Sequence, residues 1–327
     1  MINIPRDSVI YYVCSNGSSS SPVNQFRSPA SQSVPTRFAA LGDQGTFYPV
    51  GFKVAEQIAQ LPALDMVLHA GDLCYAGTSG SSSGQEIEEI WDYWGRQNQQ
   101  FSAKVPYMLT VGNHEQFYNF TSFIHRFHMP QNGVGSFLYS YNVGFFHVLS
   151  FSSEQSYTPG TEQYNFIVND LQQASQNLVQ VPWIVVVDHR PFYCSDQGEY
   201  EAHNGDPSTS TLSKYLEPLF VQYRVNLVIN GHMHVFERSL PVFNATSPYT
   251  AGDDHYTTKI APPVYITVGS GGIFLDWKWI DPQPSWSAYR ASEWGVAVVE
   301  ANATTLHYQF QTTLGRQIKD EFWISNL

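Results

Sequence analysis

Residues 227–234 read Leu-Val-Ile-Asn-Gly-His-Met-His, and this stretch decides the fold. Its first three residues are apolar and mostly β-branched, which is typical of a buried strand. A glycine and two histidines, His232 and His234, follow almost at once. Because alternate residues of an extended segment share one face, the two imidazoles can act together. The stretch therefore indicates a buried strand that ends in potential metal ligands.

Four earlier segments show the same arrangement of an apolar run followed by a compact polar cluster. The clusters are Gly42-Asp43-Gln44-Gly45 after residues 38–41, Gly71-Asp72-Leu73-Cys74-Tyr75 after 66–68, Gly112-Asn113-His114-Glu115 after 107–111, and Asp188-His189 after 183–187. In open α/β sheets, ligands bind in the crevice at the carboxyl ends of the strands. We expect all five clusters to converge there if the strands are parallel neighbours. We interpret the glycines before Asp43, Asp72, Asn113 and His232 as residues that permit the sharp turn at each strand end.

The order of the elements predicts an α/β fold. From Thr36 onwards, apolar strands alternate with helical patterns, as in layered α/β proteins. Helices are expected over about 50–61, 85–101, 161–178 and 209–223, a short helix ending near 129, and a hairpin over 137–151. After His234 the chain becomes β-rich, with strands at 264–268, 294–299, 306–310 and near 322. Residues 1–35 differ, since two short extended pieces flank a Ser/Gly turn. They are either the tail of a β-sandwich domain or edge strands docked on the main domain.

Composition limits the classes of function. The chain has 327 residues, 43% of them hydrophobic, and a formal net charge of −12. Such an acidic protein repels phosphate backbones, so nucleic-acid binding is not expected, and an enzyme for phosphate esters would need local positive charge such as metal ions. No apolar run reaches the length of a membrane span, and the first residues do not form a secretory signal.

Cysteines and glycosylation motifs bear on the compartment. The odd number of cysteines allows at most one internal bridge, so they are buried thiols or one bridge with a leftover; they are Cys14, Cys74 and Cys194. Four Asn-x-Ser/Thr motifs lean towards secretion; they are at Asn16, Asn119, Asn244 and Asn302.

The five clusters together contain a ligand set for two metal ions. One carboxylate can bridge, so seven groups can hold two ions and leave positions for water and substrate. These groups are Asp43, Asp72, Tyr75, Asn113, His189, His232 and His234. Oxygen and imidazole donors without thiolate suit iron, manganese or zinc. Two metals about 3.5–4 Å apart are the usual clamp for attack at phosphorus. Each motif alone has a simpler interpretation, such as a Gly-Asp turn, a core His189 or a packing Tyr75, but five ordered clusters at strand ends point to one site.

The five blocks resemble those of the purple acid phosphatases: Gly-Asp-x-Gly, Gly-Asp-x-x-Tyr, Gly-Asn-His-Glu, Val-x-x-His and Gly-His-x-His. The resemblance runs from about Thr36 to the end of the chain. It implies a four-layer α/β/β/α sandwich of two mixed sheets over 36–327. It also implies that residues 1–35 are the last strands and linker of an N-terminal fibronectin-like β-sandwich domain, so that the chain is N-terminally truncated.

The resemblance also assigns the ligands. It implies that Asp43, Tyr75 and His234 bind Fe(III), that Asn113, His189 and His232 bind a divalent iron, zinc or manganese ion, and that Asp72 bridges the two. Tyr75 is the discriminating residue, because the wider calcineurin-like metallophosphoesterases lack a tyrosine there. Its phenolate would give the family's purple charge-transfer band.

The expected activity is the hydrolysis of small phosphate monoesters by an acid phosphatase that is secreted, lysosomal or vacuolar. His114 is expected to stabilise the phosphoryl group or assist the leaving oxygen, and Glu115 and Asp188 to orient ligands. The family usually has one or two histidines after the Val-x-x-His block; here the loop offers His203, which is either catalytic or a plain surface residue. A phosphodiesterase or pyrophosphatase is the alternative enzyme, and a non-catalytic metal- or phosphate-binding scaffold is the alternative class. The oligomeric state is open.

Overall fold

The structure, a computed structural model, describes residues 7–28, 31–77, 86–133, 135–197, 211–259 and 262–326. The helices are α1 (Pro49–Gln60), α2 (Glu88–Ser102), α3 (Thr121–Arg126), α4 (Glu162–Gln176) and α5 (Thr211–Gln222), with a 3₁₀ turn at Asn113–Glu115. The strands are β1 (Val9–Tyr12), β2 (Asn24–Arg27), β3 (Thr36–Leu41), β4 (Met66–Ala70), β5 (Tyr107–Thr110), β6 (Tyr139–Val143), β7 (Phe146–Ser150), β8 (Trp183–Val187), β9 (Leu227–Asn230), β10 (Phe236–Ser239), β11 (His255–Thr257), β12 (Val264–Val268), β13 (Ser287–Ala291), β14 (Gly295–Ala301), β15 (Thr305–Thr312) and β16 (Ile318–Ser325).

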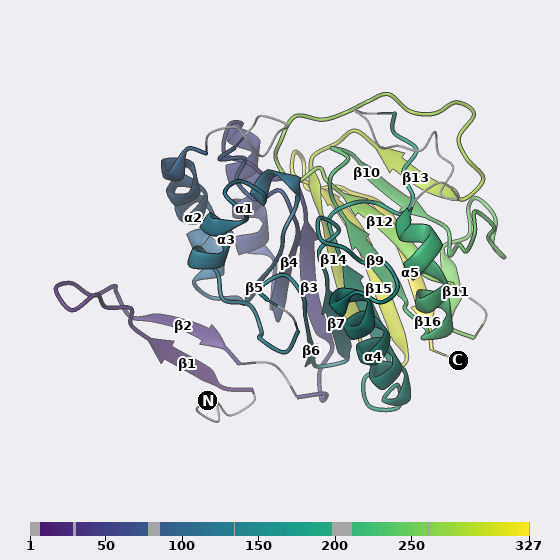
Figure 1. Cartoon of the computed structure of the whole chain (residues 1–327), viewed down its shortest axis with the longest axis horizontal. Helices are drawn as coiled ribbons and strands as arrows, with labels where there is room; N and C mark the ends of the chain where they lie inside the picture. The colour runs from purple at the N-terminus through teal and green to yellow at the C-terminus, as the bar shows by residue number, and fades with distance from the viewer. Residues whose placement is uncertain are drawn as a thin grey trace.

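Two mixed sheets form the centre of the molecule. Within the described residues, seven strands pair in the order β13-β10-β12-β9-β8-β7-β6 and seven in the order β11-β16-β15-β14-β3-β4-β5. Figure 1 shows α1, α2 and α3 on one flank and α4 and α5 on the other. The predicted four-layer α/β/β/α sandwich is confirmed.

The alternation of side chains along the strands explains the layers, because successive residues of a strand point to opposite faces. In β3, Phe38 and Ala40 belong to the core between the two sheets. The intervening Ala39 and Leu41 pack with Val54 of α1 on the outer face. Strands β8 and β9 are also buried on both faces, which is why each reads as a continuous apolar run.

The strands that carry the polar clusters are divided between the two sheets. Strands β3, β4 and β5 are parallel neighbours in one sheet, and β8 and β9 are parallel neighbours in the other. The condition attached to their convergence, that the strands be parallel neighbours, is therefore met only within each sheet. Two sets of strand ends instead meet across the interface between the sheets.

Strands β1 and β2 pair only with each other and form a separate two-stranded sheet. Figure 1 shows this hairpin extending away from the sandwich. Tyr12 Oη donates to the carbonyl of Ala103 at 2.7 Å, and Gln32 in the following segment donates to Gly144 at 2.8 Å. The hairpin therefore contacts the main domain without joining either of its sheets within the described residues. The assignment of residues 1–35 to a β-sandwich domain stays a prediction.

Local details differ from the sequence expectations. Cys14 is exposed, Cys74 and Cys194 are buried, and all three are free thiols. Of the two alternatives, the structure therefore has buried thiols at Cys74 and Cys194 and no bridge with a leftover thiol. The short strands β10, β11 and β13 were not predicted. None of the helices in the described ranges combines the length and apolar character that crossing a bilayer requires.

Candidate metal centre

Three of the expected ligands form one group of converging donor atoms. The hydroxyl of Tyr75 lies 3.0 Å from Asp43 Oδ1 and 3.0 Å from His234 Nε2. His234 Nε2 is 3.6 Å from the same Asp43 oxygen. These residues follow β4, β3 and β9, so the group joins the strand ends of both sheets.

A second group of donors lies beside the first. His189 Nε2 is 3.0 Å from Asn113 Oδ1 and 3.2 Å from His232 Nδ1. Asp72 Oδ2 lies 3.3 Å from His189 Nε2. Ligand atoms of Asp72, His189 and His232 all fall within 4.8 Å of one another, a spacing that fits a metal ion.

The charges in the site suit cation binding. Burial lowers the pKa of His232 and of His234 to about 3, so both rings are neutral. Burial opposes ionisation of Asp72, but His189 outweighs it and holds the pKa of Asp72 far below its ordinary range. Burial raises the pKa of Tyr75, and the carboxylates of Asp43 and Asp72 raise it further. Burial raises the pKa of Asp43, and Asp72 outweighs burial and raises the pKa of His189 to about 10, so both groups hold protons that bound metal ions would displace.

Hydrogen bonds from the surrounding chain orient these donors. His189 Nδ1 lies 2.8 Å from the carbonyl of Ala70, so this nitrogen donates and leaves Nε2 to face the site. The backbone N–H of His232 donates to Asp43 Oδ2 at 2.7 Å, although the two residues are 189 positions apart. These contacts hold His189, His232 and Asp43, three of the expected ligands, in place without an ion.

Comparison of the sequence with known protein families agrees with a metal site at this position. Residues 36–236 match the family model described as calcineurin-like phosphoesterase, and residues 262–321 match iron/zinc purple acid phosphatase-like protein C. The chain is 31% identical over 336 residues to probable purple acid phosphatase 20 of Arabidopsis thaliana, covering 98% of this chain and 72% of that protein. It belongs to the purple acid phosphatase family.

Other relatives support the assignment to the purple acid phosphatases. Acid phosphatase type 7 of Mus musculus is 32% identical over 300 residues, covering 88% of this chain and 67% of that protein. The structure of purple acid phosphatase PPD1 from yellow lupin seeds (Lupinus luteus) superposes with a TM-score of 0.80 at 26% identity, covering 94% of this chain and 57% of that one. The chain thus spans roughly three fifths to three quarters of the lengths of these relatives.

The hydrogen bonds of Glu115 and Asp188 do not go to the side chains of the expected ligands. Glu115 bonds to the backbone, and Asp188 bonds to a side chain at the end of a strand. The Glu115 carboxylate accepts from the backbone N–H groups of Asp72 at 2.9 Å and Gly112 at 2.8 Å, which ties the loops after β4 and β5 together. Asp188 accepts from the Asn230 side chain, and its other oxygen is buried without a partner. Glu115 therefore positions Asp72 through the main chain.

The ligands themselves, rather than the glycines before them, adopt most of the unusual backbone conformations. Asp43, Asp72, Tyr75 and His232 have φ of 56°, 51°, 58° and 69°, in the left-handed region. Such residues cost roughly 1–3 kcal/mol each and cluster at functional sites. Only Gly71 among the four preceding glycines shares this region, so our conformational interpretation of the other three is wrong.

Lack of space is the better explanation for Gly112. A Cβ atom there would lie 2.2 Å from Asp72 Oδ1 and 2.8 Å from His189 Nε2. We expect Gly112→Ala to displace both ligands and to lower the metal content from about two ions per chain to one or fewer, as measured by elemental analysis. Gly95→Ala is the matched control, because a Cβ on Gly95 of α2 meets nothing within 4 Å. A Gly112→Ala protein with its full metal complement would contradict this explanation.

His114 lies at the edge of the site and outside both donor groups. Its Nδ1 is 2.7 Å from the carbonyl of Gly77, and its Nε2 is 4.0 Å from Asp72 Oδ2. Its ring centroid is 4.4 Å from that of Tyr75, and 18% of its side chain is exposed. The ring can therefore reach a ligand bound over the metals. His203 lies outside the described residues.

Sequence reasoning missed two features of the site. Arg190 directly follows His189, and its Nη1 lies 3.2 Å from His232 Nε2. Asp276, in the loop after β12, accepts from the backbone N–H of His234 at 3.1 Å. The position of Arg190 next to a proposed ligand could have indicated its place in the site. The sequence around Asp276 contains no comparable signal.

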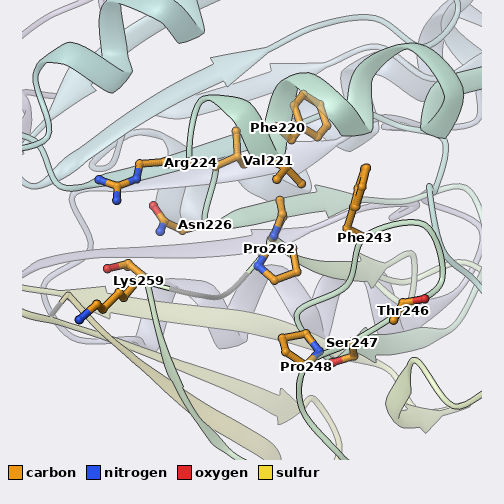
Figure 2. A pocket seen from close by; sticks show the side chains of 13 residues that line it. Phe220, Val221, Arg224, Asn226, Phe243, Thr246, Ser247, Pro248, Lys259 and Pro262 are labelled. Carbon is orange, nitrogen blue, oxygen red and sulfur yellow. The ribbon is translucent and has the colours of Figure 1, made fainter.

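A cavity of about 490 Å³ lies elsewhere in this purple acid phosphatase. Figure 2 shows Phe220 and Phe243 on one side of it and Arg224 and Lys259 on the other. Asn226, which also lines the cavity, precedes β9, whereas the metal ligands follow that strand. The cavity is therefore at the opposite end of the sheet and takes no part in the metal centre.

Proposed function

We propose that the chain is an acid phosphatase that hydrolyses phosphate monoesters at a dinuclear Fe(III)–M(II) centre, where M is iron, zinc or manganese. The observation that carries the proposal is the pair of adjacent donor groups with Asp72 beside them, in a member of the purple acid phosphatase family. In the proposed arrangement, Asp43, Tyr75 and His234 would hold Fe(III), and Asn113, His189 and His232 would hold the divalent ion. Asp72 would be the carboxylate shared by the two ions.

When bound, the ions would supply positive charge for the phosphoryl oxygens and a hydroxide nucleophile at acid pH. The chain supplies orientation and proton chemistry. His114 would donate a hydrogen bond from Nε2 to the phosphoryl group in its imidazolium form, which carries a hydrogen on both ring nitrogens, since the Gly77 carbonyl takes the hydrogen on Nδ1. We keep His203 as a candidate proton donor to the leaving oxygen, which Ala substitution would test through a slower turnover of substrates with poor leaving groups.

The activity is tested with matched substrates on the metal-loaded protein. We expect kcat/KM for p-nitrophenyl phosphate to exceed that for bis(p-nitrophenyl) phosphate by at least about tenfold, with an optimum in acid. A preference for the diester or for pyrophosphate would favour the alternative reactions. Full metal content without turnover of any ester would indicate a binding scaffold instead.

Tyr75→Phe tests the ferric site. The phenolate is a hard anionic donor to Fe(III), and the resemblance to the family attributes the visible band to it. We expect the variant to lose essentially all of this band while it remains folded, as measured by absorption and circular dichroism. Tyr308→Phe is the control, since Tyr308 is buried between the sheets and its hydroxyl has no hydrogen-bond partner. An unchanged spectrum of Tyr75→Phe would reject the tyrosinate ligand.

We also propose that the protein is a secreted, lysosomal or vacuolar glycoprotein. Asn16, Asn119, Asn244 and Asn302, the asparagines of the four glycosylation motifs, are all exposed. Each is therefore accessible to a glycan. Protein from a eukaryotic secretory host whose mass does not change on treatment with an N-glycosidase would refute the proposal.

A further inference from the structure

Arg190 is held in one orientation beside the metal centre. Its Nε donates to Glu154 Oε1 at 2.6 Å, and its Nη2 donates to Glu154 Oε2 at 3.1 Å. Glu154 is itself fixed, because its side chain is only 3% exposed and accepts from Gln116 at 2.6 Å. A two-pronged pair of this kind removes most of the freedom of a guanidinium. The remaining nitrogen, Nη1, is thereby aimed in a fixed direction.

That direction leads to His232. Arg190 Nη1 lies 3.2 Å from His232 Nε2, while the other ring nitrogen, Nδ1, faces the donor group around His189. An imidazole that binds a metal through one nitrogen carries its hydrogen on the other. In the loaded protein, His232 Nε2 and Arg190 Nη1 are therefore both N–H donors directed at the same small volume. An acceptor atom of a bound ligand in this volume would receive a hydrogen bond from each of them.

A phosphoryl oxygen has the chemistry to accept hydrogen bonds from both groups. Arg190 carries a permanent positive charge in a protein whose net charge is −12, and 22% of its side chain is exposed, so a ligand can reach it. Hydrogen bonds from a guanidinium to phosphate are among the stronger ones in proteins.

We propose that Arg190, together with His232 Nε2, binds a terminal oxygen of the substrate phosphate and thereby favours monoesters over diesters. A monoester has three terminal oxygens and a diester has two. If two oxygens face the two ions, only the monoester retains a third for the guanidinium. This inference rests on the proposed function, because it assumes that the site takes phosphate esters.

The first test is direct binding of inorganic phosphate to the metal-loaded protein by calorimetry. We expect Arg190→Gln to weaken phosphate binding by about 10- to 100-fold and Arg190→Lys by about 3- to 10-fold, since lysine keeps the charge without the fork. Arg126→Gln is the control, because Arg126 is also held by two carboxylates, Glu88 at 2.7 Å and Asp92 at 2.9 Å, but away from the site. It should leave phosphate binding unchanged.

The second test compares the two model esters. We expect Arg190→Gln to lower kcat/KM for p-nitrophenyl phosphate by about 10- to 100-fold and to leave that for bis(p-nitrophenyl) phosphate nearly unchanged. Metal content and melting temperature are measured on every variant. If Arg190→Gln does not fold or does not retain metal, Arg190→Lys is the deciding variant. A phosphate affinity of Arg190→Lys equal to that of the wild type then overturns the proposal.

The outcomes separate this inference from the proposed function. In one outcome, the wild-type protein turns over monoesters and both Arg190 variants bind phosphate as tightly as it does. That result leaves the proposed function in place and rejects the role of Arg190. Such a result would mean that Arg190 only braces Glu154 and the loop that carries Gln116. In a second outcome, the Arg190 variants bind phosphate more weakly than the wild type, but the wild type turns over no ester. That result would support the role of Arg190 in anion binding and reject the phosphatase function.

Discussion

Asp72→Asn is expected to lower kcat/KM for p-nitrophenyl phosphate by at least about 10³-fold, because the substitution removes the negative charge that the two proposed ions would share. Asp72 is 1% exposed, and its Oδ2 lies 3.3 Å from His189 Nε2. Its Oδ1 accepts from the backbone N–H of His114 at 2.9 Å, so the carboxylate also positions the loop that carries the proposed catalytic residue. An amide has the same size but only one oxygen and no charge.

The measurement combines elemental analysis with steady-state kinetics. Loss of one or both ions should accompany the loss of turnover. Asp92→Asn is the matched control, because Asp92 is an exposed carboxylate on α2 that pairs with Arg126 at 2.9 Å. An Asp72→Asn protein that keeps two ions and most of its turnover would show that Asp72 does not bridge.

The second large effect is expected at His114. We expect His114→Ala to lower kcat by about 10²- to 10⁴-fold, the usual contribution of a positioned acid or electrostatic stabiliser. Its ring lies beside Tyr75 but in neither donor group, so metal content and the visible band should stay the same. Single-turnover kinetics measure the change in rate, and the absorption spectrum of the same preparation measures the visible band.

His125→Ala provides the control for His114→Ala, since His125 is an exposed histidine of α3. Full turnover in His114→Ala would remove the residue from the mechanism, while the metal centre could stand. Loss of the visible band in the same variant would instead make His114 necessary for the ferric site, contrary to its placement here.

Strands and helices with regular apolar patterns were predicted well, because the pattern depends on neighbours in the chain. Strand β10 was missed for a physical reason. Its central residues, Glu237 and Arg238, are charged yet buried, which no apolar pattern would suggest. Arg238 is stabilised by Asp320 at 2.6 Å, and Glu237 accepts from Ser195 Oγ at 2.7 Å. Those partners are distant in sequence, so the strand cannot be recognised locally.

The site was predicted from the position of polar residues after apolar runs, which is a local property of the chain. That pattern identified all seven proposed ligands, of which Asp43 and His232 are in contact across 189 positions of sequence. The role of Gly112 was misjudged, because the crowding at its Cβ comes from Asp72 and His189 on other loops. The orientation of Arg190 towards His232 depends on Glu154, which no motif contains.

The sequence by itself determined which segments form strands and helices and which side chains end each strand, since both depend on the periodicity of neighbouring residues. Only the tertiary structure decided that the strand ends belong to two sheets, and that Asp72 lies beside both donor groups. It also decided that Arg190 is aimed at His232. The physical reason is that these relations arise from the packing of one sheet on another, which brings together residues far apart in the chain and leaves no periodic signal within it.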